Sequence, residues 1–341
     1  MGFGSSRRLS ACAVVLACIA VAHPGAASAS RLIDRNATGV SLQLNAKGEA
    51  LLTYRVRGLT RHVLVWGAVN ALPSRDQAAQ VAFRVDYSGG YAKYFEDNPR
   101  ARALAAEYHR IRSTPGYLAS PIVKRLRRLQ QAAGSYWRTG FAGGCEPYHG
   151  PPLAWTVVAC TAPDGSYWAV QEWQRELPDY GVAPSPSQAV WELRLSHWSG
   201  PLPVLTIETD WSWHRWDHLF GRLTYLGRPV FGFRSTRSGS PLDAYGRNVY
   251  IDTYDSAYGR GWRRENSALT HTGTGAFCYS VNPHRGHPAG RGSRYRVTVI
   301  GPGVTPDLAW VGPAPGAYEA AADEAANRRI AALGDGLCRP N

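Results

Sequence analysis

The sequence lacks the short motifs by which many nucleotide-dependent enzymes are recognised. It contains no Walker phosphate loop, no glycine fingerprint for a dinucleotide and no GxSxG nucleophile elbow. These absences argue against nucleotide chemistry, and no cofactor is expected.

Lysine is scarce: the chain has three lysines among its 38 Lys and Arg residues. Arginine, alanine and glycine are all abundant, as codon usage in a GC-rich genome produces without selection on the protein. The 12 Trp, 18 Tyr, 36 Gly and 23 Pro favour short strands and turns over a helical bundle.

Long apolar runs are absent after the first thirty residues, so no transmembrane span is expected in the mature chain. The one long run, residues 9–22, follows Arg7 and Arg8 and precedes the small residues 27–29. This arrangement predicts a signal peptide over 1–29 and a mature N-terminus near Ser30. We therefore expect a secreted or cell-envelope protein.

Two other export routes stay open. The pair Arg7-Arg8 resembles a twin-arginine signal, although the residues that follow it do not continue that pattern. Cys18 is a candidate for a lipid anchor, because residues 9–17 are just long enough to form the apolar region that an anchor requires.

Cysteine is rare in the mature chain, and none of it has the CxxC spacing of a metal site. An even number of cysteines in an exported chain predicts disulfides. The four cysteines of the mature chain can be connected in three ways, each with two disulfides. We favour the connectivity that closes the shortest loops, in which each disulfide contributes about 3–4 kcal/mol by the chain-entropy argument. These pairs are Cys145 with Cys160 and Cys278 with Cys338.

The patterned segments predict an antiparallel, mainly β or α+β fold built from hairpins. Residues 205–214 alternate apolar and polar side chains with the period of a strand. Two apolar runs around Gly227 predict a hairpin, and residues 248–254 predict a further strand. The glycine- and proline-rich segment 140–152 divides the chain into parts 30–142 and 143–341, which can also form one continuous domain.

Two helices are predicted inside the first part, at about 98–133. Asn98 before Pro99 and Ser120 before Pro121 are helix-start signals. The basic run at residues 124–128 lies on the second helix, where it is either a solvated face or a binding surface for phosphate-rich polymer or an anionic membrane. An alanine-rich helix is predicted at 317–333.

Residues 208–218 contain the candidate catalytic and metal-binding groups. Glu208 and Asp210 are two residues apart on one strand, a separation of roughly 6.5–7 Å that fits a pair of glycosidase carboxylates. His214, Asp217 and His218 have the HxxxH spacing that places two imidazoles on one helical face, near a carboxylate, as in some zinc peptidases. Ordinary sheet packing explains both sets as well.

Two similar loops are candidate binding sites. Aspartate, tyrosine and arginine together can clamp a polyol or an anion. If residues 248–254 form a strand, however, the loops lie about 20 Å or more apart and cannot share a small ligand. The six residues are Asp243, Tyr245, Arg247, Asp255, Tyr258 and Arg260.

Two hypotheses about function remain. The first is a non-catalytic cell-envelope or extracellular protein that binds an acidic or carbohydrate polymer through arginines and aromatic rings. The second is a secreted hydrolase, glycosidase-like or metal-dependent, that uses the acids and histidines of 208–218. Nucleic acid is not an expected partner, because the chain is predicted to be exported and its aromatics do not interleave with the basic run.

Overall fold

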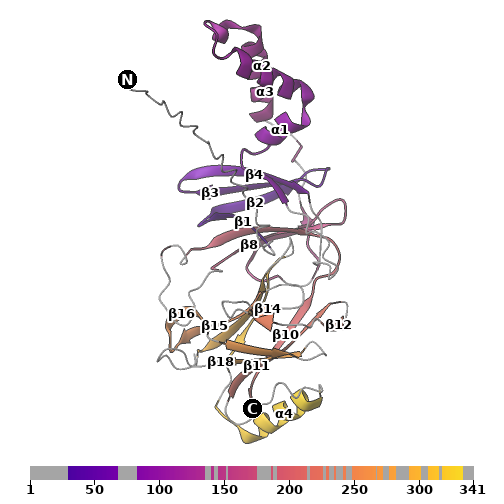
Figure 1. Ribbon diagram of the computed structural model, residues 1–341. Coiled ribbons are helices and arrows are strands. Elements are labelled where there is room, and N and C mark those ends of the chain that lie inside the picture. Colours follow the sequence, from indigo (N-terminus) through magenta and orange to yellow (C-terminus); the bar gives the residue numbers. More distant parts are fainter. Residues whose placement is uncertain are drawn as a thin grey trace, which may run out of the picture.

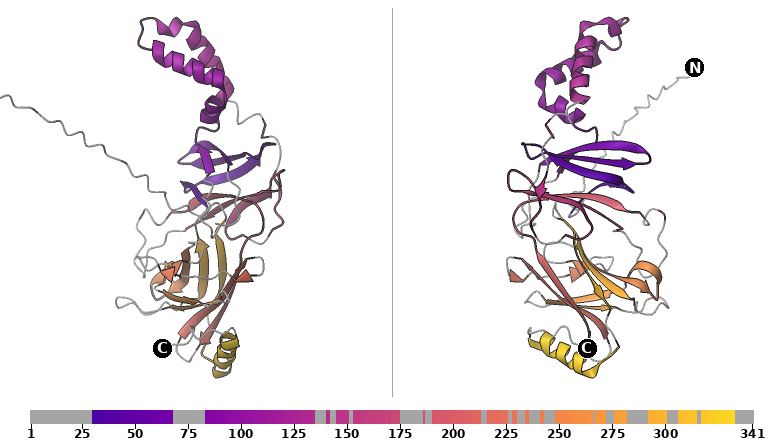
Figure 2. Two further views of the ribbon diagram at one scale, coloured as in Figure 1. Left: turned by 45° about the vertical axis from the view of Figure 1, so that its right-hand side comes forward. Right: turned by 180° about the vertical axis from the view of Figure 1, so that it is seen from behind.

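The computed structural model of the protein is elongated, with helices at both ends of a stack of antiparallel sheets (Figure 1). Helices α1 to α3 lie at one end and α4 lies at the other, beyond the last sheets (Figure 2). The structure describes residues 30–67, 83–134, 140–141, 145–150, 153–174, 186, 190–212, 216–225, 228–229, 234–235, 241–242, 248–265, 267–271, 276–281, 292–300, 306–314 and 317–332.

The first two sheets pack face to face as a sandwich. Sheet 1 has the strand order β2-β3-β4-β5 and consists of β2 (Thr38–Leu44), β3 (Ala50–Val56), β4 (Leu59–Gly67) and β5 (Phe83–Asp86). Sheet 2 has the order β1-β9-β8-β7-β6 and consists of β1 (Arg31–Arg35), β6 (Glu146–Pro147), β7 (Thr156–Thr161), β8 (Tyr167–Trp173) and β9 (Glu192–Trp198).

The core of the sandwich follows from the alternation of side chains along its strands. Ala50, Leu52 and Tyr54 of β3 face sheet 2, where they join Trp168 and Leu195 in one buried cluster. The intervening Leu51 packs on the opposite face of sheet 1 with Leu64 and Phe141. This core combines residues from both sides of the predicted boundary at 142, and the division into two domains stays a prediction.

The remaining sheets occupy the other half of the stack. Sheet 3 has the order β10-β11-β18-β17, with β12 paired to β11, and consists of β10 (Val204–Ser212), β11 (Trp216–Tyr225), β12 (Arg228–Pro229), β17 (Ser267–His271) and β18 (Ala276–Val281). Sheet 4 has the order β13-β14-β15-β19-β20, with β16 paired to β15, and consists of β13 (Arg234–Ser235), β14 (Pro241–Leu242), β15 (Asn248–Ser256), β16 (Gly259–Arg264), β19 (Arg294–Ile300) and β20 (Leu308–Pro313).

Helices α2 and α3 begin where the sequence places their caps. Asn98 accepts hydrogen bonds from the amides of Arg100 and Ala101 at the start of α2, and Ser120 accepts one from Ile122 at the start of α3. The described helices are α1 (Tyr91–Asp97), α2 (Pro99–Ile111), the 3-10 turn η1 (Tyr117–Ala119), α3 (Pro121–Gly134) and α4 (Ala320–Ala332), which contacts β10.

The predicted fold class is confirmed: the chain is strand-rich and antiparallel, with a helical insertion and a C-terminal helix. The strand predicted at 248–254 is part of β15, and β11 and β12 pair antiparallel where the hairpin around Gly227 is predicted, although residues 226–227 and 230–233 lie outside the described residues. Helix α1 was not predicted, because its seven residues carry no cap signal in the sequence. Among the described helices, none is long and apolar enough to cross a bilayer.

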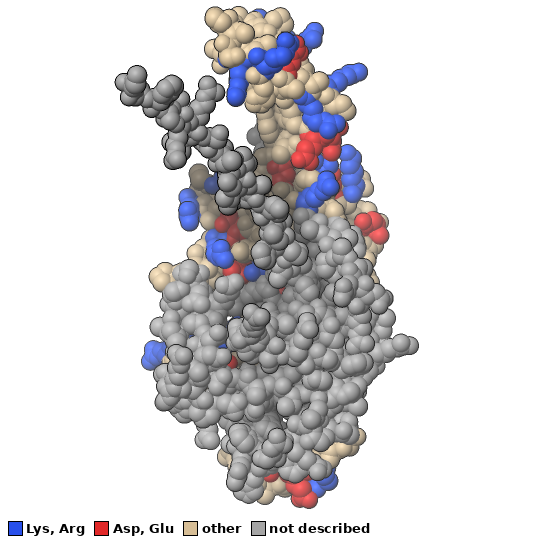
Figure 3. All heavy atoms as spheres, in the orientation of Figure 1, with Lys and Arg blue, Asp and Glu red and all other residues tan. Residues whose placement is uncertain are grey.

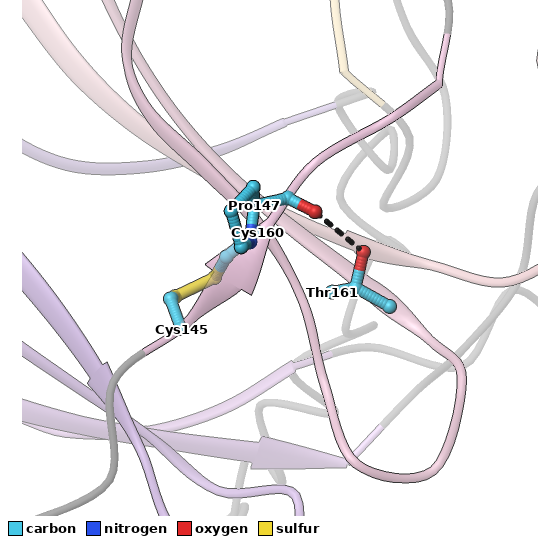
Figure 4. Close-up of a disulfide and its surroundings, with 4 residues drawn as sticks. All are labelled: Cys145, Pro147, Cys160 and Thr161. Atoms are coloured by element: carbon cyan, nitrogen blue, oxygen red, sulfur yellow. Dashed lines mark hydrogen bonds between the residues drawn. A yellow bond between two sulfur atoms is a disulfide. The ribbon is translucent and has the colours of Figure 1, made fainter.

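One of the two predicted disulfides lies within the described residues and is formed. Cys145 and Cys160 are bonded, with their Cα atoms 5.1 Å apart (Figure 4). The bond ties the short strand β6 to β7, and the Thr161 hydroxyl adds a 3.3 Å hydrogen bond to the Pro147 carbonyl oxygen. The predicted partner of Cys278, Cys338, lies outside the described residues.

Removing this disulfide is expected to destabilise the protein. It closes a loop of 15 residues, for which loss of unfolded-chain entropy corresponds to about 3 kcal/mol. We expect the variant Cys145→Ala/Cys160→Ala to lose about that free energy of unfolding in urea titrations. Alanine is used instead of serine because serine would place a buried hydroxyl at position 160. A loss below about 1 kcal/mol would show that β6 and β7 hold together without the bond.

Candidate functional site

One face of sheet 4 carries alternating charged and aromatic residues. The register of the sheet aligns them in rows, because Asp252 of β15 lies between Arg264 of β16 and Arg296 of β19. In the next row, Tyr254 lies between Trp262 and Arg294. We call these residues, together with Tyr250, the arginine–aromatic face.

Asp252 is the centre of this face. Its side chain is fully buried, and each carboxylate oxygen accepts from a different arginine: Oδ1 from Arg264 Nε at 2.8 Å and Oδ2 from Arg296 Nε at 2.8 Å. Burial alone would raise the pKa of Asp252, but the two guanidinium charges and their hydrogen bonds outweigh burial and hold the pKa below its ordinary value. Asp252 therefore remains a carboxylate inside the protein.

The arginines are enclosed by rings as well as paired. The guanidinium carbon of Arg296 lies 4.6–5.2 Å from the ring centroids of Trp262, Trp173 and Trp155. The guanidinium carbon of Arg264 lies 3.8 Å from the Tyr250 centroid. These distances are within the range of cation–π attraction, so the rings replace part of the hydration that the buried cations lose.

Trp155 and Trp173 belong to the neighbouring sandwich, so this packing joins sheet 2 to sheet 4. Their rings are stacked with centroids 4.4 Å apart. Trp173 also donates from Nε1 to the buried carboxylate of Asp307, just before β20, at 3.2 Å. Gln171 of β8 completes the contact, because its side chain donates to the Asp307 carbonyl oxygen and accepts from the Asp307 amide.

Ser30 and Arg194 extend these contacts to the first strand of the sandwich. The Ser30 hydroxyl lies 3.3 Å from both carboxylate oxygens of Asp307. The Ser30 carbonyl oxygen accepts from Arg194, which forms an ion pair of 2.7 Å with Glu192. We call the contacts of Asp307 and Arg296 with the sheet 2 side of the sandwich the polar seam.

The outer row of the arginine–aromatic face reaches solvent. Arg294 is exposed, and its guanidinium carbon lies 4.4 Å from the Tyr254 centroid and 5.7 Å from the Trp262 centroid. Both rings are half-buried and meet edge to face at 5.2 Å. The arrangement holds a planar cation over the Tyr254 ring and near the Trp262 ring at the surface, and we call these three residues the exposed rim.

The predicted residues of 208–218 lie on strands β10 and β11 where they are described. Their backbone register places Asp210 directly opposite His218, while Glu208 is opposite Phe220 and Asp217 is opposite Trp211. The helix that an HxxxH site requires is not present at Asp217 and His218, because both belong to β11. His214 lies outside the described residues.

The two predicted binding loops are described unequally. Asp243, Tyr245 and Arg247 lie outside the described residues. The second loop is the turn between β15 and β16, where Asp255 accepts a hydrogen bond of 2.7 Å from the amide of Gly261. In that loop Tyr258 is buried and Arg260 is exposed.

A serine–histidine pair outside these predictions also resembles a catalytic arrangement. Ser166 Oγ lies 2.9 Å from His197 Nε2 and 2.6 Å from a carboxylate oxygen of Asp164. Ser166 and His197 are only 3% and 2% exposed, however, and the imidazole is stacked on Trp168 at 3.8 Å. A nucleophile must be reached by its substrate, so we assign this pair to anchoring the β7–β8 turn on β9.

Sequence reasoning missed the arginine–aromatic face. Its signal is present as period-two spacing, with Tyr250, Asp252 and Tyr254 on one strand and Arg294 and Arg296 on another. The spacing does not reveal which strands are neighbours, and that pairing is what brings the charges together. Among the described residues, no group of three His, Cys, Asp or Glu side chains is placed to hold a metal ion.

Breaking the ion pair at Asp252 is expected to be costly. Asp252→Asn leaves two buried arginines without their counter-charge, so we expect a loss of about 3–5 kcal/mol in the free energy of unfolding measured with urea. The matched control is Asp97→Asn, where the carboxylate pairs with Lys93 at a site whose aspartate side chain is 62% exposed. That change should cost less than about 1 kcal/mol. Equal effects would contradict a central role for Asp252.

The same carboxylate makes stability depend on pH. Because folding lowers the pKa of Asp252, its stabilisation is complete above the unfolded-state pKa of about 3.9 and is lost as the pH falls through the folded-state pKa. The difference in unfolding free energy between wild type and Asp252→Asn should therefore shrink in urea titrations below about pH 4. A difference that stays constant down to acid pH would disprove this assignment.

Known proteins offer no guide to this site. No family model matches the chain, and no match was found among the curated proteins or the solved structures. The interpretation of the arginine–aromatic face therefore rests on its own geometry.

Proposed function

We propose that the protein is an exported, non-catalytic binding protein of the cell envelope or extracellular space, and that it recognises an acidic or carbohydrate polymer. The observation that carries this proposal is the exposed rim, in which Arg294 stands at the surface beside Tyr254 and Trp262. A guanidinium offers parallel hydrogen bonds to a carboxylate, sulfate or phosphate, and the two half-buried rings next to it offer apolar contact to a sugar.

The buried row of the arginine–aromatic face, which contains Asp252, Arg264 and Arg296, supports this use of the exposed rim. Asp252 and Arg296 are buried and bonded to each other, so the strands that carry Tyr254 and Arg294 are fixed two residues away. Binding groups on fixed strands lose little conformational entropy when a ligand arrives. The formal net charge, which is +13 for the whole chain and +11 without Arg7 and Arg8 of the predicted signal peptide, also favours the approach of an acidic polymer.

A single substitution tests the rim. Arg294→Ala should weaken binding to an insoluble acidic polysaccharide in co-sedimentation by about 1–2 kcal/mol, because one charged contact is removed from an exposed site. Trp262→Ala should weaken binding in high salt as well, since apolar contact is not screened. Arg55→Ala, at an exposed position on sheet 1, is the matched control and should bind as wild type does.

The hydrolase is the second candidate, and the pairing of Asp210 with His218 across β10 and β11 favours it. It predicts soluble products from the polysaccharide, with their release abolished by Asp210→Ala and unchanged by Arg294→Ala. That pattern would replace the binding proposal. Retained polymer without soluble products, lost in Arg294→Ala, would support binding.

A further inference from the structure

The helical hairpin formed by α2 and α3 is a second surface, at the opposite end of the sandwich from sheet 4. Figures 1 and 2 show it extending away from the sheets, with the segment between the helices at its far end. The two helices contact each other, and Ala101, Val123 and Leu126 are buried. Helix α1 packs against both helices, and the exposed positions of the hairpin are available to a partner.

The charge of this hairpin is strongly one-sided. Residues 98–134 contain eight arginines and lysines and one acidic residue, Glu107, a formal net charge of +7. All eight cations are exposed, and within the described chain only Arg110 has an ion-pair partner, Glu107 at 3.5 Å. Figure 3 shows Lys and Arg side chains along this end of the molecule. The cations are Arg100, Arg102, Arg110, Arg112, Lys124, Arg125, Arg127 and Arg128.

The far end of the hairpin is apolar at its tip. Leu118 in η1 is 57% exposed, which is among the highest values for a large hydrophobic side chain in the described residues. The neighbouring Tyr117 is half-buried, with its ring 6.0 Å from the ring of Tyr108 on α2. Arg112 and Lys124 lie within about one helical turn of this tip along α2 and α3.

We infer that the hairpin docks tip-first on an anionic phospholipid surface. Leu118 enters the boundary between headgroups and acyl chains, while the arginines and Lys124 behind it meet the lipid phosphates. Long cationic side chains suit this position because their stems lie along apolar surface while their charges stay in water. A soluble polyanion would use the same cations but has no use for an exposed leucine at the tip.

Vesicle co-sedimentation of the purified protein tests the inference. The protein should bind vesicles that contain phosphatidylglycerol, bind pure phosphatidylcholine vesicles weakly, and be released from the anionic vesicles by salt. Lys124→Glu/Arg125→Glu should weaken binding to the anionic vesicles by at least roughly tenfold. Leu118→Ser should weaken it by roughly tenfold without any change in charge.

Matched controls separate docking from general charge and from misfolding. Arg55→Glu/Arg57→Glu makes the same change of charge at exposed positions of sheet 1 and should bind the vesicles as wild type does. Far-UV circular dichroism should be the same for all variants, since the substituted side chains are exposed. Equal loss in this control, or no binding to anionic vesicles, overturns the inference.

A soluble polyanion is the competing outcome. If Leu118→Ser binds anionic vesicles as wild type does, and soluble polyphosphate binds the hairpin as tightly as vesicles do, then membrane docking is wrong. Because the exposed rim plays no part in this assay, Arg294→Ala should leave vesicle binding unchanged. The inference can therefore fail while the polymer-binding proposal stands, and the reverse also holds.

Discussion

The buried charge of Asp252 is the constraint on which the second half of the described chain depends. A carboxylate removed from water needs compensation on both oxygens, and the antiparallel register supplies one arginine from each neighbouring strand. Those arginines are buried in turn and need rings around them, which brings Trp262 of the same sheet and two tryptophans of the sandwich to the same place. The ion pairing of Asp252, the register of its strands and the contact between sheets 2 and 4 thus all follow from the need to compensate one buried charge.

A buried ion pair of this kind contributes more to fixing one arrangement of the sheets than to the free energy of unfolding. A buried ion pair gives back in Coulombic attraction about what its desolvation costs, whereas removing one partner is strongly unfavourable. An apolar contact between sheets 2 and 4 would tolerate small shifts, but the polar seam requires each donor to meet its acceptor. The Gln171–Asp307 pair shows this, since it uses both the donor and the acceptor of one side-chain amide. The exposed rim lies on the same sheet, so the polar seam also fixes the position of the rim relative to the sandwich.

Local pattern made the elements of this fold predictable, while the candidate site depends on contacts that the pattern does not contain. Asn98 and Ser120 cap their helices as expected, because capping involves only the next few residues. The Cys145–Cys160 bond was also predictable, since closing a short loop is favoured. The meeting of Asp252 with Arg264 and Arg296 was not, because Arg296 is 44 residues away and the sequence does not state which strands pair. His218 shows the converse: its HxxxH spacing indicated a helix, but His218 lies in the strand β11, paired with β10.

The stacked pair Trp155 and Trp173 gives the joint between the two halves a spectroscopic signature. Both indoles belong to the sandwich, and they are nearly parallel at 4.4 Å, so the stack itself lies on the sheet 2 side, while the cation beside it, Arg296, comes from sheet 4. Near-ultraviolet circular dichroism reports fixed aromatic packing, whereas the far-ultraviolet region reports backbone structure. Separation of the halves with both sets of strands intact would remove Arg296 from both rings and Asp307 from Trp173, and would therefore change the near-ultraviolet signal while leaving the far-ultraviolet signal as it was. The molecule carries its own optical probe of the seam, without any label.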